Sequence, residues 1–227
     1  MIPDTIIYIP NFISQEEEQK LIDHVYSAPK PKWTHLSNRR LQNWGGLPHP
    51  KGMVAEDIPQ WLDLYCDKIG KLDLFEGKKP NHVLVNEYSP GQGIMPHEDG
   101  PLFYPTVTTI SLGSSTVLDF YTHINQGKAE DKSEPCSENM SKKFEDRHVC
   151  SVYLEPRSLV IVKDDMYTKY LHGIKEQTED MVDDRICNIK QCSDINIDNI
   201  KTRQTRISLT IRLVPKVLKT KLFFGKK

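Results

Sequence analysis

RISLTIR, residues 206–212, alternates strictly between polar and apolar side chains. A period of two indicates a β-strand with two different faces, one of them aliphatic. The polar face carries Arg206, Ser208, Thr210 and Arg212. If this face points into a sandwich, two guanidinium groups are buried, which costs several kcal/mol each unless they meet anions. The stretch therefore predicts either a strand that lines an anion-binding cavity or a strand whose polar face lies in water.

Similar strand-like runs precede this one, beginning at His82. They are short, rich in β-branched and aromatic residues, and separated by Gly, Pro and Asn. In one-letter code they are HVLVNEY, TVTTISLG, STVLDFYT, CSVYLEP and SLVIVK. Many short strands in succession suggest an antiparallel double sheet of the jelly-roll type.

The N-terminal part has a different texture, with one strand and two helices. TIIYI at residues 5–9 predicts the strand, and Ser14 with Glu17 forms a capping box that opens a helix ending before Pro29. A second helix is predicted around residues 58–69. We therefore expect an α+β protein, a jelly-roll core supported by N-terminal helices.

The length of 227 residues is suited to a single domain. We expect the helical part over residues 1–80 and the core over 81–214. Long, mobile surface loops are predicted near 123–148 and 175–201, because both segments are polar and poor in aromatic residues. A basic tail, 215–227, completes the chain.

Composition points away from a membrane or a disulfide scaffold. No apolar run is long enough for a membrane span and the first ten residues do not read as a secretory signal, so we expect a cytoplasmic or nuclear protein. The five cysteines are scattered without any CxxC, which predicts reduced thiols: Cys66, Cys136, Cys150, Cys187 and Cys192. A monomer is assumed.

The charges are unevenly distributed although the net charge is only −1. No acidic residue lies between Asp23 and Glu56, and none follows Asp198. Such segregation can create a local basic surface for a polyanion. The alternative is two solvated charged faces that never meet.

A candidate metal site begins with the pair His97 and Asp99 in the segment MPHEDGP. In an extended segment, side chains two residues apart point to the same side and can reach one ion. A second histidine, His172, follows the apolar strand at 159–162. Two imidazoles and one carboxylate are the ligands that non-haem Fe(II) oxygenases use. Taken singly, the HxD pair could be a chance match and His172 an ordinary loop histidine.

Asn86 and Tyr88 add polar groups to the same region of the chain. They share one face of the strand HVLVNEY, and the turn at Pro90-Gly91 returns the chain toward His97. An amide and a phenol can donate hydrogen bonds to carboxylate oxygens. Alone, the pair would simply mark the end of a strand.

The chain carries four motifs in succession: NxYxPG, HxD, a distant His and RxSLTxR. Their order resembles that in the AlkB family of Fe(II)/2-oxoglutarate dioxygenases. The resemblance runs from about Thr5 to Arg212, and LQNWGG, MPHEDGPLFYP, ISLGS, VLDFY and EPRSL resemble one animal branch in particular. It implies a double-stranded β-helix core with iron bound by His97, Asp99 and His172. The residues implied to bind 2-oxoglutarate are Asn86, Tyr88, Arg206, Ser208 and Arg212. At Ser208 the chain departs from AlkB itself, which has Asn, so that contact stays open.

The resemblance also implies the chemistry. Fe(2+), 2-oxoglutarate and O2 act together: the co-substrate is oxidised to succinate and carbon dioxide while a substrate C–H bond is hydroxylated. An N-methyl group hydroxylated in this way is lost as formaldehyde. The family's usual substrates are alkylated bases of DNA or RNA, so nucleic acid is the expected partner, and Arg206 is expected to pair with the far carboxylate of 2-oxoglutarate.

The expected substrate contacts lie in the acid-free segment and just after the HxD pair. They are Trp33, Arg39, Arg40, Trp44, Phe103 and Tyr104. Arginine and aromatic side chains can stack on an extruded base and touch phosphates, but each aromatic residue could equally be part of the core.

Three other functions stay open at this point. The chain could be a dioxygenase that acts on a protein side chain, a catalytically quiet module that binds nucleic acid or protein, or a cupin-like protein using another ion. An intact set of ligands and arginines favours an enzyme, because a binding module has no need for a costly buried charge cluster.

Overall fold

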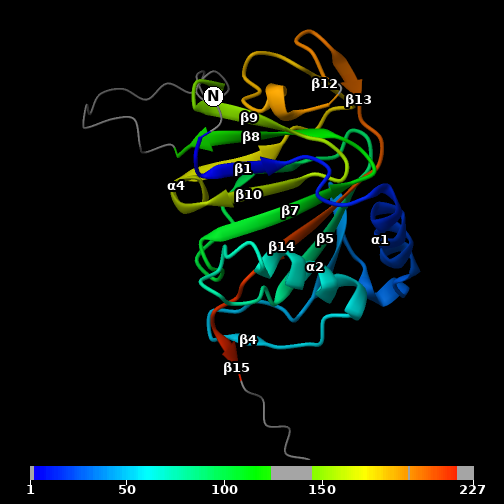
Figure 1. Ribbon diagram of the computed structural model, residues 1–227, viewed down its shortest axis with the longest axis vertical. Coiled ribbons are helices and arrows are strands. Elements are labelled where there is room, and N and C mark those ends of the chain that lie inside the picture. The colour runs from blue at the N-terminus through cyan, green and yellow to red at the C-terminus, as the bar shows by residue number, and fades with distance from the viewer. Residues whose placement is uncertain (1–2, 124–144, 194, 219–227) are drawn as a thin grey trace, which may run out of the picture.

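Two antiparallel sheets form the body of the protein, as the computed structural model shows for residues 3–123, 145–193 and 195–218 (Figure 1). The larger sheet has seven strands, in the order β1 (Ile6–Ile9), β10 (Leu159–Lys163), β7 (Thr106–Leu112), β14 (Arg206–Arg212), β5 (His82–Tyr88), β3 (Arg39–Trp44) and β2 (Thr34–Leu36). The smaller sheet has four, in the order β6 (Ile94–His97), β11 (Tyr170–Ile174), β8 (Thr116–Thr122) and β9 (His148–Leu154). The predicted double-stranded β-helix with supporting helices is confirmed.

The central strands of the larger sheet are covered on both faces, while the edge strand β2 is exposed. Against one face pack α1 (Gln15–Ser27) and α2 (Gln60–Gly70), forming a core with the aliphatic side of β14 (Figure 1). Against the other face lies the smaller sheet, through a second core that includes Phe120 and Val160. The polar side of β14 therefore faces the space between the two sheets.

Local sequence signals set the ends of both helices. The Ser14 backbone N–H donates to Glu17 Oε2 at 2.7 Å, and the Glu17 N–H donates to Ser14 Oγ at 3.2 Å, so the predicted capping box is present. Helix α2 begins at Gln60, slightly later than predicted. The reason is Pro59, which takes the N-cap position and forces the preceding residue out of helical conformation.

Several short elements complete the structure. They are η1 (Lys30–Lys32), β4 (Met53–Val54), α4 (Asp164–Thr168), β12 (Glu179–Met181), η2 (Ile189–Gln191), β13 (Ile200–Thr202) and β15 (Val217–Leu218). β15 pairs with β4, so the predicted basic tail begins as a strand; residues 219–227 lie outside the described part, as does most of the predicted loop at 123–148.

The segment 175–201 differs from the surface loop predicted for it. β12 and β13 pair within or beside it, and Val182, Ile186 and Ile195 are buried against Tyr153 of the smaller sheet. The apolar residues are widely spaced, so the polar average of the segment conceals the small core that they form.

Two further sequence expectations concern the cysteines and a membrane span. Every cysteine in the described residues is free, while Cys136 lies outside them. In the same part of the chain, no helix combines the length and apolar character needed to cross a bilayer.

Candidate active site

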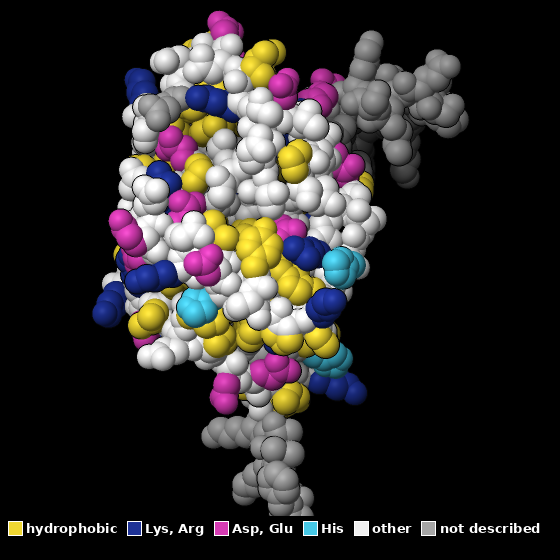
Figure 2. Space-filling view, turned by 90° about the vertical axis from the view of Figure 1, so that its right-hand side faces the viewer, with side chains coloured by type: hydrophobic (Ala, Val, Ile, Leu, Met, Phe, Trp, Pro, Cys, Tyr) yellow, Lys and Arg dark blue, Asp and Glu magenta, His cyan; other side chains and the backbone are white. Residues whose placement is uncertain are grey.

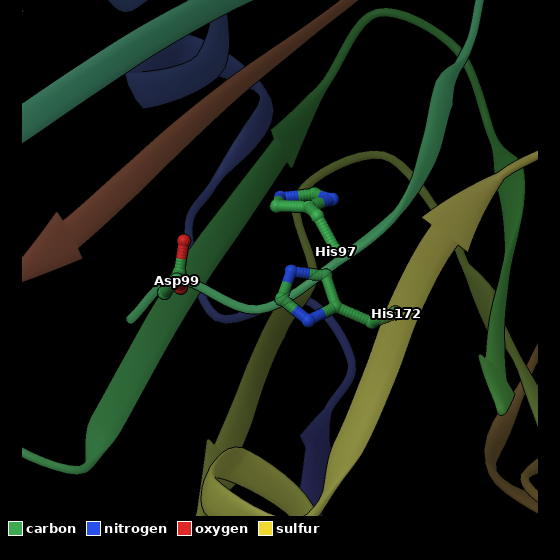
Figure 3. Close-up of side chains that lie close together, drawn as sticks. All are labelled: His97, Asp99 and His172. Atoms are coloured by element: carbon green, nitrogen blue, oxygen red, sulfur yellow. The ribbon is translucent and has the colours of Figure 1, made fainter. Parts of the chain in front are cut away.

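His97, Asp99 and His172 converge between the two sheets (Figure 3). His97 ends β6 and Asp99 follows it by two residues, while His172 lies on the neighbouring strand β11 directly opposite His97. One ligand atom from each of the three side chains lies within 4.8 Å of the other two. The structure thus brings together the three residues that the sequence proposed as metal ligands.

Both imidazoles are prepared to offer a lone pair. His97 Nδ1 lies 2.9 Å from the Met95 carbonyl oxygen, which can only accept, so this nitrogen carries the proton and Nε2 is left for an ion. The pKa of His172 is lowered to about 4, chiefly by burial; Asp99 opposes this shift, and His97 and Arg212 add to it. His172 is therefore neutral near pH 7.

Asp99 completes the set and has a spare oxygen. Its Oδ1 accepts from Arg212 Nη1 at 2.8 Å, which orients the carboxylate. Among the described residues, its buried Oδ2 has no hydrogen-bond partner. A buried polar atom without a partner costs about 1–3 kcal/mol, and a bound cation would satisfy it. The donor set therefore fits Fe(2+).

A cavity of about 270 Å³ adjoins these three side chains. Its polar wall comes from alternate residues of β5 and β14: Asn86, Tyr88, Arg206, Ser208, Thr210 and Arg212. The rest of the wall is largely aliphatic, including Leu118 and Val162 from facing sheets. The cavity therefore combines one polar wall with aliphatic residues from both sheets.

Arg206 is one of two buried arginines of this wall, and Arg212 is the one that pairs with Asp99. The residue is only 4% exposed, and its Nη2 donates to Ser111 Oγ at 2.9 Å. Burial lowers the pKa of Arg206 to about 10, so it remains charged at neutral pH. No salt bridge to Arg206 and no partner for its Nε occurs within the described ranges. A buried, charged guanidinium without a salt bridge can bind the free carboxylate of a dicarboxylate such as 2-oxoglutarate.

Comparison with known proteins decides the family. Residues 30–212 match the family model of the 2OG-Fe(II) oxygenase superfamily. The chain belongs to this superfamily. A zebrafish (Danio rerio) protein described as a probable RNA/DNA demethylase ALKBH6 is 53% identical over 99% of this chain and 92% of its own length. An uncharacterised mimivirus protein, L905, is 31% identical, covering 92% of this chain and 84% of its own.

The family model and the zebrafish relative confirm the resemblance to the AlkB family, and the animal branch that the sequence resembles is that of ALKBH6. Similar solved structures support only the fold of this oxygenase, because their sequence identity to it is low. OsALKBH1 has a TM-score of 0.57 at 12% identity, covering 93% of this chain and 99% of its own. A Pseudomonas putida prolyl-4-hydroxylase has a TM-score of 0.52 at 11% identity, and the match covers 95% of this chain and 94% of its own.

Arg39 and Arg40 of the acid-free segment, both predicted to contact the substrate, lie on opposite faces of β3. Arg39 lines the cavity, and its Nε donates to Asn86 Oδ1 at 3.2 Å. Arg40 points to the helix side, where Nε and Nη2 bind the two oxygens of Glu87, each at 2.8 Å, and its guanidinium lies 4.1 Å from the Trp33 ring centre. Successive side chains of a strand point to opposite faces, so the neighbours cannot both reach the cavity.

The predicted aromatic contacts also lie outside the cavity wall. Trp44 packs edge-on against Trp61 of α2 at 5.9 Å. Tyr104 packs against Phe75 in the helix-side core. The ring centre of Phe103 lies nearer the site, 3.9 Å from the guanidinium carbon of Arg212. Phe103 packs against that arginine but does not line the cavity. These are packing contacts outside the cavity lining, so base stacking by these residues stays a prediction.

The basic character of the acid-free segment is also reduced in the folded oxygenase. Glu87 pairs with Arg40, and Glu56 lies 3.9 Å from Lys32. On the face shown in Figure 2, Lys and Arg side chains lie among Asp, Glu and apolar side chains. This face therefore has no single-sign charge field, and Arg39 is the cation that the segment presents to the cavity.

Two further residues of the site were missed in the sequence. Ser111 orients Arg206, and Glu98 lines the cavity while pairing with His123 at 2.8 Å. Period two in the run TVTTISLG would have placed Ser111 on the same face as Thr109, which also lines the cavity. Glu98 stands inside the HxD motif itself.

Gly173 allows the two ligand-bearing strands to approach each other. A Cβ built on it would lie 2.8 Å from the Pro96 nitrogen and 2.9 Å from the Ile94 oxygen, both backbone atoms of β6. We expect Gly173→Ala to push β6 and β11 apart and to weaken Fe(II) binding about ten- to a hundredfold, as loss of supporting contacts does elsewhere. Titration with Fe(II) under nitrogen would measure this.

Gly70→Ala is the matched control for that experiment. Its Cβ would meet nothing closer than 3.7 Å, so the metal affinity should not change. Equal affinity in the Gly173 and Gly70 variants would show that the strands tolerate the extra carbon.

Proposed function

We propose that this oxygenase removes alkyl groups from nucleic-acid bases by oxidative demethylation, with Fe(2+), 2-oxoglutarate and O2. One observation carries the proposal: the three candidate ligands and an unpaired buried guanidinium share one cavity. The nucleic-acid part is supported by the zebrafish relative, whose description is that of a probable RNA/DNA demethylase. A cytoplasmic or nuclear location would suit such a substrate.

In this proposal, each polar residue of the cavity has a separate task. His97, Asp99 and His172 hold the iron, which with 2-oxoglutarate and O2 supplies the oxidation of a substrate C–H bond. Arg206 binds the far carboxylate of 2-oxoglutarate, because its fork matches two carboxylate oxygens.

The remaining wall residues orient these groups. Ser111 fixes the Arg206 side chain and Arg212 fixes Asp99, as their hydrogen bonds indicate. Asn86 and Tyr88 donate to carboxylate oxygens of the co-substrate, with Ser208 beside them on the same wall. The aliphatic side of the cavity keeps water away from the reacting carbon.

Product analysis tests the reaction itself. Incubation with a panel of methylated oligonucleotides should release formaldehyde and succinate in equal amounts, together with the unmodified base. Succinate with a hydroxylated peptide, but no formaldehyde from any oligonucleotide, would instead support the protein side-chain dioxygenase. No succinate with either substrate would support the quiet binding module.

Salt dependence tests the contact with nucleic acid. If Arg39 neutralises one phosphate of a single strand, the log-log slope of affinity against salt should fall in magnitude by about 0.7 in Arg39→Gln. Arg40→Gln is the matched control, because its guanidinium is already bound by Glu87; its slope should equal that of wild type. Fluorescence anisotropy with a labelled oligonucleotide would give both slopes. Identical slopes for all three proteins would remove Arg39 from the phosphate contacts.

A further inference from the structure

Arg39 joins strand β3 to the wall of the cavity where 2-oxoglutarate is proposed to bind. Its Nε donates to Asn86 Oδ1 at 3.2 Å, and Asn86 is only 5% exposed. A guanidinium has donors and no acceptor. The amide oxygen of Asn86 must therefore face Arg39, which leaves the amide nitrogen and its two hydrogens for the rest of the cavity.

We propose that Arg39 is a positioning residue for the co-substrate, which holds the Asn86 amide in the orientation that offers donors to a carboxylate. The proposal rests on the proposed function, where Asn86 contacts 2-oxoglutarate. With the amide turned over, its oxygen would face the carboxylate, and two acceptors would repel each other. One hydrogen bond therefore decides whether Asn86 attracts or repels the ligand.

Neighbouring contacts hold Arg39 in place. Asn38, the preceding residue, donates a hydrogen bond to Glu176, which follows the strand that carries His172. Arg40, the next residue, is fixed by Glu87 on the opposite face of β3. The backbone at Arg39 is thus tied on both sides of the residue.

The charge of Arg39 also reaches the phenol beside Asn86. Burial raises the pKa of Tyr88, and Arg206 and Arg39 both counteract this shift. Arg206 also lies directly opposite Tyr88 in the pairing of β14 with β5. Two guanidinium groups therefore act on the same end of the cavity, where an anion would be most favourable.

Binding of 2-oxoglutarate to the Mn(II)-loaded protein tests the proposal, because titration calorimetry then measures affinity without turnover. Arg39→Met, which has a similar length but no donor, should raise the Kd for 2-oxoglutarate about tenfold, the loss expected for one hydrogen bond that serves a charged ligand. Arg39→Lys keeps a donor without the fork and should give an intermediate Kd. Arg185→Gln, which alters an exposed arginine outside the cavity lining, should bind 2-oxoglutarate as wild type does.

A double-mutant cycle shows whether Arg39 acts through Asn86. In an Asn86→Ala background, Arg39→Met should cause a clearly smaller loss of affinity than in the wild-type background, since the amide that it orients is absent and only the effect of its charge is left. Asn86→Asp keeps a partner for Arg39 but presents only acceptors, so it should bind 2-oxoglutarate more weakly than Asn86→Ala. Affinity for Mn(II) alone should be equal in all these variants, which a merely structural role would not predict.

Two results would overturn the proposal. Additive losses in the cycle would mean that Arg39 acts independently of Asn86. Unchanged 2-oxoglutarate affinity in Arg39→Met, with normal binding by wild type, would remove the positioning role and leave the proposed function intact. Failure of the wild-type protein to bind 2-oxoglutarate at all would instead overturn the proposed function itself.

Discussion

His172→Ala should abolish succinate formation from 2-oxoglutarate while the protein remains folded. Each of the three candidate ligands supplies one of only three protein groups for the iron, so losing one should lower turnover at least about a hundredfold. His97→Ala and Asp99→Ala should behave in the same way. Fe(II) and 2-oxoglutarate would be added in the absence of oxygen, and the metal-to-ligand charge-transfer absorption would be recorded. This measurement would separate lost binding from slow chemistry.

The control for this series is His49→Ala, which removes an exposed imidazole far from the cluster in sequence. Its turnover and absorption should match those of wild type. If any one of the three ligand variants kept the wild-type rate, that residue would not be an iron ligand.

Arg206→Lys should have the second large effect, on the co-substrate rather than on the metal. An ammonium cannot form the planar two-point contact of a guanidinium, and in this position it would also disturb the contact with Ser111. We expect the apparent KM for 2-oxoglutarate to rise about ten- to a hundredfold, while Fe(II) affinity changes little. Initial rates at a series of 2-oxoglutarate concentrations would show this.

Arg203→Lys provides a matched comparison for that variant. Arg203 is also buried, but it is paired with Asp180 at 2.6 Å. Its replacement should lower the melting temperature and leave the KM unchanged. An unchanged KM in Arg206→Lys would place Arg206 outside the co-substrate site.

The alternation in β14 predicted which of its side chains share a face and left open whether the polar face lines a cavity or lies in water; the alternation has a physical cause. Side chains on one side are buried against α1 and α2, and those on the other line the cavity, so both faces are under strong constraint. The convergence of His97 with His172 was less certain, since it depends on the pairing of β6 with β11, which no local signal specifies.

The roles of Arg39 and Arg40 could not be separated in the sequence. They are neighbours of the same type, and only the register of β3 against β5 decides which one enters the cavity. A slip of one residue would exchange them. Similarly, Trp44 could be assigned to packing only once α2 was seen beside it.

The position of β14 in the larger sheet has a consequence for how the chain is made. β14 is among the last described segments to be synthesised, yet it lies between β7 and β5 near the centre of the sheet. Until it leaves the ribosome, β5 and β7 lack the partner that joins them and expose open strand edges, which favour aggregation. Arg206 and Arg212 arrive on the same strand, so the closing of the sheet and the completion of the anion site are one late event in folding.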